Sequence, residues 1–150
     1  MPSSFDSSSA GPVLLFDGEC GLCQRVVRLL LRMDRGGGLR FAALQGPAAQ
    51  VYLRAHGLPV GDFDSLVFVP DWARRAERNF ALRTEGVIAA LRAVGGAGRG
   101  LAAGLAMFPV AWRDAGYRRV ARWRYRIFGQ WRARPLARAE WAARFLDGVE

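Results

Sequence analysis

The stretch from Val13 to Cys23 constrains the fold more than any other part of the chain. An apolar run, Val-Leu-Leu-Phe, leads through Asp-Gly-Glu into the only two cysteines, which are spaced Cys-x-x-Cys. Beyond them, apolar residues at positions 22, 26, 29, 30 and 33 form one stripe on a helix of 3.6 residues per turn. The pattern predicts a buried strand over Val13–Phe16, a tight turn, and a helix from about residue 21 to 33 or 34. The first turn of that helix carries both cysteines.

Two cysteines at a helix N-terminus are suited to thiol–disulfide exchange. Free backbone N–H groups and a partial positive charge stabilise a thiolate there, and can lower a thiol pKa to roughly 3.5–7.5. We therefore expect Cys20 to be partly exposed and to attack, and Cys23 to lie further toward the core and resolve the mixed disulfide. Gly18 should relax the turn, and Gly21 should leave the sulfur accessible. Asp17 ends the strand, where its carboxylate is placed to exchange a proton with Cys23.

Other interpretations of the same residues stay open at this point. The cysteines could be inert core residues, or half of a zinc site. Zinc normally takes four Cys or His ligands, and His56 is the one histidine, so only a site shared across a dimer would fit. Asp17 is also a residue type typical of turns and helix caps. His56 precedes Gly57, which favours a helix C-terminal cap over a ligand.

The rest of the chain extends the first strand and helix into a mixed α/β pattern. The Gly36–Gly38 run ends the first helix, and an apolar segment without charges over Leu66–Val69 predicts a central strand. Thr84 is predicted to be the N-cap of a helix. The remaining predicted elements are a strand over Leu39–Ala43, a helix over Pro47–Ala55, a hairpin strand over Asn79–Arg83 and a helix over Glu85–Val94. The predicted order is therefore β-α-β-α-β-β-α.

The segment Asp17-Gly18-Glu19-Cys20-Gly21-Leu22-Cys23 resembles the signature of the DCC family of thiol–disulfide oxidoreductases, which is named for its Asp-Cys-Cys pattern. Similar residues carry the resemblance over about residues 12–130, namely Asp34, Leu39-Arg40-Phe41, Thr84-Glu85-Gly86, Tyr117 and Arg124-Tyr125. The resemblance implies a thioredoxin-like fold, a redox-active disulfide between Cys20 and Cys23, and Asp17 as the acidic member of the motif. Leu22 departs from thioredoxins, which usually have proline there.

Composition divides the chain into three predicted parts. Residues 1–11 are a Ser-rich tail, expected to be disordered, without the charged and apolar regions of a signal peptide. Residues 12–95 are the predicted thioredoxin-like redox core. Residues 96–150 are predicted to be an Arg-rich helical extension that packs on the core. In this extension the apolar segment Leu101–Phe108 is too short to span a bilayer, Pro109 breaks it, and helices are expected over about 110–131 and 136–146.

Arg124 is unusual among the arginines of the extension. In the predicted helix over 110–131, four arginines lie opposite the apolar stripe, namely Arg118, Arg119, Arg122 and Arg126, whereas Arg124 falls within the stripe. A buried guanidinium needs an acidic or carbonyl partner. We therefore predict that Arg124 supports the site by pairing with a carboxylate at the active-site end, Asp17 and Asp34 being the candidates.

The charge balance raises a second class of function. All 22 basic residues are arginine, the net charge is +9, and residues 113–150 hold 10 Arg against 4 acidic residues. The C-terminal Arg/Trp helices could instead form a basic binding module for nucleic acid or an anionic membrane surface. A phosphotransferase is a third possibility, because Asp17 ends an apolar strand, but Glu19 stands where the haloacid-dehalogenase motif has its second Asp. No matching downstream Lys exists.

The sequence as a whole predicts a thiol–disulfide oxidoreductase. It should exchange a Cys20–Cys23 dithiol with a protein or a low-molecular-weight thiol or disulfide, and take electrons from an external thiol system. No metal, flavin or nucleotide cofactor is predicted. Nucleic acid is not an expected partner, and a membrane-bound partner stays open. Two cysteines are too few for a secreted disulfide scaffold, so we expect a reducing compartment, the cytoplasm.

Overall fold

Four strands form one mixed sheet in the computed structural model, which describes residues 11–34, 38–61, 65–128 and 145–146. The strands are β1 (Val13–Phe16), β2 (Arg40–Ala43), β3 (Val67–Val69) and β4 (Ala81–Leu82), in the order β2-β1-β3-β4. β1 runs parallel to β2 and antiparallel to β3, and β3 is antiparallel to β4. The apolar runs of the sequence form β1 and β3, both buried along their whole length and both interior to the sheet.

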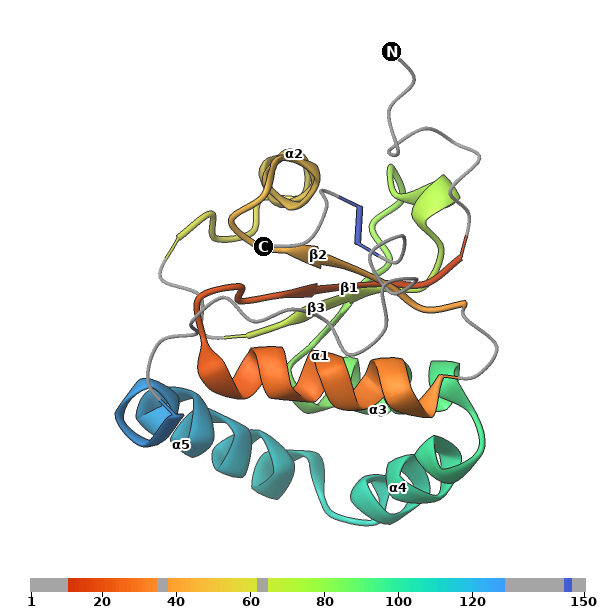
Figure 1. The fold of residues 1–150 in the computed structure, drawn as a ribbon, viewed down its shortest axis with the longest axis vertical. Helices are drawn as coiled ribbons and strands as arrows, with labels where there is room; N and C mark the ends of the chain where they lie inside the picture. Colours follow the sequence, from red (N-terminus) through yellow and green to blue (C-terminus); the bar gives the residue numbers. More distant parts are fainter. Residues whose placement is uncertain (1–10, 35–37, 62–64, 129–144, 147–150) are drawn as a thin grey trace.

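Helices cover both faces of this sheet, as Figure 1 shows. α1 (Gly21–Met33) and α3 (Arg83–Val94) lie on one face, and α2 (Pro47–Ala55) lies on the other. A 3₁₀ turn, η1 (Trp72–Arg74), connects β3 to β4. α4 (Ala97–Ala106) and α5 (Val110–Phe128) form a further layer: α5 packs on α1 and α3, and α4 packs on α3. The first turn of α1 thus lies between the sheet and α5.

The predicted mixed α/β order is confirmed and is consistent with a thioredoxin-like fold. β1, α1 and α2 have the predicted bounds, and the predicted strand over Leu66–Val69 is central in the sheet. The prediction for Thr84 is wrong. α3 begins at Arg83 with Leu82 as its N-cap, and the Thr84 hydroxyl donates to Asp114 Oδ1 at 2.6 Å instead of capping the helix.

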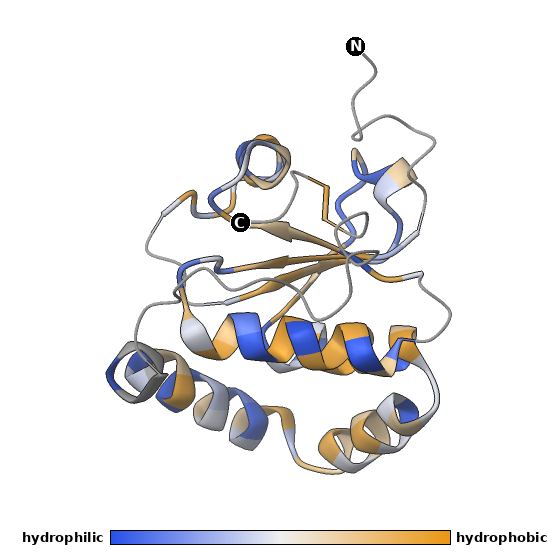
Figure 2. Cartoon of the chain, viewed as in Figure 1, coloured by the Kyte–Doolittle hydropathy of each residue, from blue (hydrophilic) through white to orange (hydrophobic). Residues whose placement is uncertain are grey.

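Alternation along β1 divides the core into two clusters. Val13 and Leu15 point toward α2, where they pack with the buried Tyr52 and Trp72. Leu14 and Phe16 point to the opposite face, toward α1 and α3. Figure 2 shows the resulting apolar strands between the helices. Phe16 and Leu14 are therefore available to line a site at the start of α1.

The C-terminal segment is described only in part. The predicted helix over 110–131 is α5, which is described as far as Phe128, and the predicted helix over 136–146 falls largely outside the described residues. At residues 145–146 the backbone pairs with β2, because Leu146 N–H donates to Phe41 O at 2.9 Å. The Phe145 ring packs against Phe16 and Phe41. The predicted division at residue 95, and the tail over 1–11, stay predictions.

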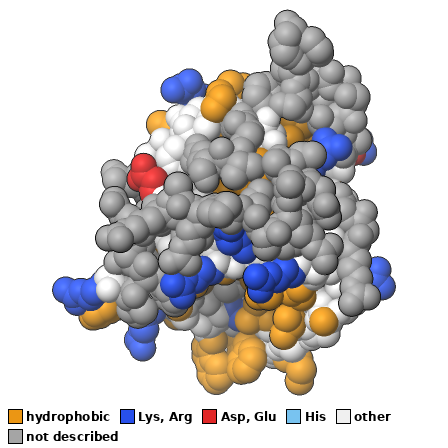
Figure 3. Space-filling model, viewed as in Figure 1, with side chains coloured by type: hydrophobic (Ala, Val, Ile, Leu, Met, Phe, Trp, Pro, Cys, Tyr) orange, Lys and Arg blue, Asp and Glu red, His pale blue; other side chains and the backbone are white. Residues whose placement is uncertain are grey.

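Apolar side chains lie exposed on the outer helical layer. Figure 3 shows basic side chains across the middle of one face and hydrophobic side chains at its lower edge. The large exposed apolar residues of α4, α5 and their connection are Leu101, Met107, Phe108, Val110, Trp112, Val120 and Trp123. Within the described part of the chain, no helix is long and apolar enough to cross a membrane.

Candidate active site

The cysteine pair lies where β1 passes into α1. Cys20 is the N-cap of α1, in an extended conformation, and its carbonyl accepts from Gln24 N–H at 3.1 Å. Cys23 follows in the first turn of the helix. The two cysteines are reduced in this structure. The predicted strand, turn and helix around the Cys-x-x-Cys motif are therefore all present.

The predicted exposures of the two thiols are wrong. Cys20 is completely buried, with 0% of its surface exposed, whereas Cys23 is half-buried. The prediction relied on the helix end alone, where a side chain at the N-cap of an isolated helix faces solvent. Around this helix end the sheet and the further helical layer decide which sulfur is reachable. Cys23, and not Cys20, is the accessible sulfur in this conformation.

A hydrogen-bond network holds the turn between β1 and α1. Asp17 is only 3% exposed, and its Oδ1 accepts from the N–H of Glu19 at 3.0 Å and from Gln45 Nε2 at 2.7 Å. The same Gln45 accepts from Gly18 N–H through Oε1, at 3.0 Å. The backbone closes the turn as well, because Cys20 N–H donates to Asp17 O at 3.3 Å. Asp17 therefore acts as a turn residue here, one of the roles that the sequence left open.

Two glutamines of this network were missed by the sequence analysis. Gln24 is buried in α1 and donates from Nε2 to Gly18 O at 3.0 Å, although the helical pattern placed it on the polar face. Gln45 reaches the turn from the connection after β2, 28 residues from Asp17. No local signal in the sequence points to Gln45, because the pairing of β1 with β2 brings it to the turn. Because the N–H and the C=O of Gly18 both form hydrogen bonds, the backbone just before Cys20 is held in one conformation.

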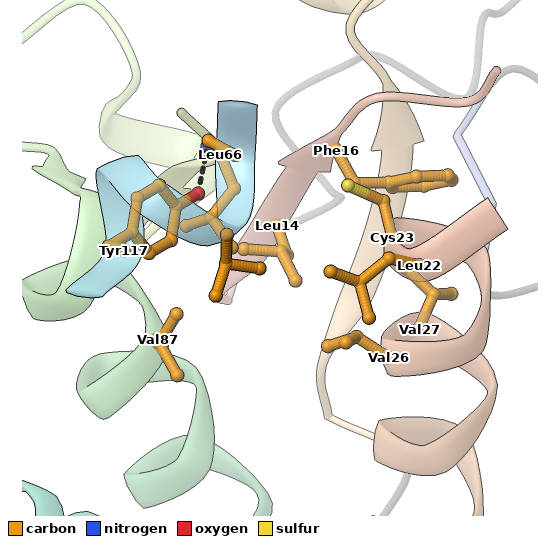
Figure 4. Close-up of a pocket in the computed structure, with 11 residues that line it drawn as sticks. Leu14, Phe16, Leu22, Cys23, Val26, Val27, Leu66, Val87 and Tyr117 are labelled. Atoms are coloured by element: carbon orange, nitrogen blue, oxygen red, sulfur yellow. Dashed lines mark hydrogen bonds between the residues drawn. The ribbon is translucent and has the colours of Figure 1, made fainter. Parts of the chain in front are cut away.

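Cys23 borders an apolar cavity of about 130 Å³ between α1, α3 and α5. Figure 4 shows its sulfur on the α1 side of the cavity, with Tyr117 on the opposite side. The Tyr117 hydroxyl accepts from Leu66 N–H at 3.0 Å, which ties α5 to the residue before β3. The remaining lining residues are Leu14, Phe16, Leu22, Val26, Val27, Val87, Val120 and Ala121.

α5 is fixed over this cavity by polar contacts with α3. Asp114 Oδ1 accepts from the buried Thr84 hydroxyl, and the Arg113 guanidinium donates to Glu85 Oε1 at 2.9 Å. The Arg113 side chain is nearly buried while Glu85 is exposed, so solvent weakens that ion pair. Together with Tyr117, these contacts place α5 beside Cys23.

The other predicted site residues are placed as follows. Gly21 is the first residue of α1 and is buried. Arg124 belongs to α5, but its side chain lies outside the described residues, so its pairing with Asp17 or Asp34 stays a prediction. His56 is the C-cap of α2, as predicted. Among the residues that the structure describes, no three His, Cys, Asp or Glu side chains come together to hold a metal.

Comparisons with known proteins identify the family of this chain. Residues 14–130 match the family model described as DCC1-like thiol-disulfide oxidoreductase. YuxK, an uncharacterized protein of Bacillus subtilis, is 34% identical over 118 residues, which cover 79% of this chain and 81% of YuxK. A DCC family protein of Arabidopsis thaliana, named as chloroplastic, is 33% identical over 128 residues, covering 85% of this chain and 71% of that protein. No solved structure matches. This chain belongs to the DCC1-like thiol-disulfide oxidoreductase family.

Proposed function

We propose that the chain is an enzyme that exchanges a Cys20–Cys23 dithiol with the disulfide of a protein or of a small thiol compound. The observation that carries the proposal is the Cys-x-x-Cys pair at the start of α1, with one sulfur at the N-cap and the other beside a cavity. The family match supports a redox role and does not support the alternative of a basic binding module. Electrons come from an external thiol reductant.

The accessible sulfur meets the partner first in this proposal. The Cys23 thiolate attacks one sulfur of a disulfide R–S–S–R′, forms a Cys23–S–S–R mixed disulfide, and releases R′S⁻, which takes up a proton. The Cys20 thiolate then attacks Cys23 Sγ, forms the Cys20–Cys23 disulfide, and releases RS⁻. This order reverses the roles expected from the sequence, and the burial of Cys20 supports the reversal. The N-cap position of Cys20 favours its thiolate for the second step.

Asp17 is the proposed proton-transfer group. Its carboxyl is buried just after β1, at the start of the turn that leads to Cys20, and a hydrogen bond from Gln45 holds it in place. A buried carboxyl at this position can accept the proton that Cys20 or Cys23 loses in exchange. Asp17→Asn should therefore lower the exchange rate and change its pH profile, while Gly18 and Gly21 serve only to shape the turn.

A redox titration tests the proposal. The purified protein is equilibrated in glutathione buffers, and free thiols are alkylated and counted by mass, with Cys20→Ser and Cys23→Ser as controls. We expect a reversible two-electron transition to a Cys20–Cys23 disulfide in the wild type, whereas each variant, with one thiol left, can form only a mixed disulfide with glutathione. Glutathione should form a mixed disulfide faster with Cys20→Ser, which keeps Cys23, than with Cys23→Ser. Absence of a reversible transition would reject the dithiol reaction. If glutathione forms its mixed disulfide faster with Cys20 than with Cys23, Cys20 attacks first, as the sequence predicts.

The compartment belongs to the proposal too. A dithiol that must be reduced after each turnover needs a reducing compartment, and the cytoplasm is the one we propose. The Arabidopsis relative is named as chloroplastic, so relatives of this chain are not confined to one compartment.

A further inference from the structure

We propose that the cavity beside Cys23 is a specificity pocket for a compact apolar group, about the size of a benzene ring, attached to the sulfur of the substrate. This inference rests on the proposed function and names its substrate class. It assigns to α5 a part in substrate recognition, through Tyr117, Val120 and Ala121. The substrate is then an aryl or branched alkyl disulfide, or an apolar side chain next to a disulfide.

The chemistry of the lining supports an apolar occupant. Ten of the residues that line the cavity are Leu, Val, Ala, Phe or Cys, and the eleventh is Tyr117. The Tyr117 hydroxyl is engaged by Leu66 N–H, so its ring is the part that faces the cavity. Among the side chains that the structure describes, no charged one lines the space. A charged or strongly polar substituent would lose its hydration there without a compensating hydrogen bond.

The size of the cavity sets the size of the group. A dry apolar cavity of about 150 Å³ in another protein binds benzene. The cavity here measures about 130 Å³ and is open on one side, so it can take a ring or a branched chain of similar volume. A larger group would have to extend past Val120, toward the second and more open hollow that Tyr117 and Val87 also line.

The position of Cys23 links the pocket to the reaction. Cys23 lines the cavity, so a group R seated there would be held beside the thiol that attacks its sulfur. Cys23 and R then share the new disulfide Cys23–S–S–R, and R′S⁻ leaves on the open side. The Leu66 N–H is already bonded to Tyr117, so an extended peptide cannot pair with that donor. The recognised feature is therefore the side group, and not a strand of the partner.

A binding experiment tests the pocket without any thiol chemistry. Toluene, which does not react with thiols, is titrated into the reduced protein, and methyl chemical shifts of the lining residues are followed by NMR. Ala121→Leu places a larger side chain in the cavity, whereas Ala115→Leu makes the same change at an exposed position of the same helix. We expect saturable shifts at Leu14 and Val26 in the wild type and in Ala115→Leu, and none in Ala121→Leu.

A labelling experiment tests the substrate class. In Cys20→Ala, Cys23 is the one remaining thiol, and it reacts with benzyl or with sulfonatoethyl methanethiosulfonate to give a mixed disulfide and methanesulfinate. Each rate is divided by the rate with free cysteine. Because the benzyl group enters the cavity and the sulfonate does not, we expect about a tenfold preference for benzyl. Ala121→Leu should abolish the preference, and Ala115→Leu should keep it.

The outcomes separate this inference from the function on which it rests. The proposed specificity pocket is overturned if the toluene shifts do not saturate, or if Cys23 prefers benzyl no more than free cysteine does. Either result counts even when the glutathione titration shows a normal two-electron transition. An equal loss in Ala121→Leu and Ala115→Leu also overturns it, since the effect would then not come from the cavity. Saturable toluene binding without a two-electron transition overturns the substrate class and the dithiol function together.

Discussion

Replacing Tyr117 and Tyr52 by Phe compares one hydroxyl that has a bond with one that has none. The Tyr117 hydroxyl accepts from Leu66 N–H at 3.0 Å, in a half-buried position between α5 and β3. The Tyr52 hydroxyl is buried and makes no hydrogen bond with any residue in the described part of the chain. Loss of the hydroxyl should therefore lower the unfolding free energy at Tyr117 but not at Tyr52.

The expected magnitudes follow from these contacts. Tyr117→Phe leaves Leu66 N–H half-buried without its acceptor, which costs about 1–2 kcal/mol of unfolding free energy. For a chain of this length that lowers Tm by roughly 2–8 °C. Tyr52→Phe removes a buried polar atom without breaking a bond, so its unfolding free energy should stay the same or rise by up to about 1 kcal/mol.

Tyr52→Phe should also change how the unfolding free energy depends on pH. Burial raises the pKa of Tyr52 to about 12, and the Arg78 charge opposes this shift only in part. In the unfolded chain a Tyr loses its proton near pH 10. Because the folded chain holds the Tyr52 proton to a higher pH than the unfolded chain does, the unfolding free energy falls as the pH rises from about 10 toward 12. Tyr52→Phe should therefore flatten the alkaline limb of the curve of unfolding free energy against pH.

Urea unfolding at pH 7, repeated between pH 9 and pH 12, measures both effects. The alkylation rate of Cys23 is a third measurement. In Tyr117→Phe, α5 should loosen over the cavity and Cys23 should react faster. In Tyr52→Phe the rate should not change, because Tyr52 lies on the other face of the sheet. Equal unfolding free energies for the two variants would refute the assignment of the Leu66–Tyr117 bond. Equal alkylation rates would refute its role in holding α5 at the cavity.

Three further predictions concern the turn, the packing of α3 and the N-terminal loop. Gln45→Leu should cost about 1–3 kcal/mol in urea unfolding and change the alkylation rates of both thiols, because it removes both bonds to the turn before α1. Gly86→Ala should destabilise by about 1–3 kcal/mol, since a Cβ would lie 2.9 Å from Ala81 O, while Gly104→Ala in open space should stabilise by about 0.5–1 kcal/mol. The N–H groups of Gly11 and Ala73 lower the pKa of Asp71, so its stabilising contribution is lost as the pH falls below about 4. Asp71→Asn should therefore flatten the acid limb of the curve of unfolding free energy against pH.

Most of the fold could be predicted because its elements carry their signals locally. β1 and β3 are short apolar runs bounded by turn residues, and α1 has apolar residues at helical spacing, so their positions could be read within a residue or two. The predicted stripe of α1 is only partly its buried face, because Val27 and Leu31 are buried and Leu29 is exposed. Thr84 shows the limit of such reasoning. It has the side chain of an N-cap, but Asp114 of α5 accepts from its hydroxyl, and Arg83 begins the helix with a φ of 52°. A tertiary contact replaced the local preference.

The site was predictable only to the extent that it is local. The Cys-x-x-Cys motif and its helix end belong to one short segment, so the location of both cysteines at the start of α1 followed from the sequence. Access to the sulfurs depends on segments far away in the chain: Gln45 fixes the turn from beyond β2, and Tyr117 brings α5 over Cys23. The Cys-x-x-Cys motif at the start of α1 is thus encoded in seven consecutive residues, whereas the cavity beside Cys23 depends on a helix that begins 87 residues after Cys23.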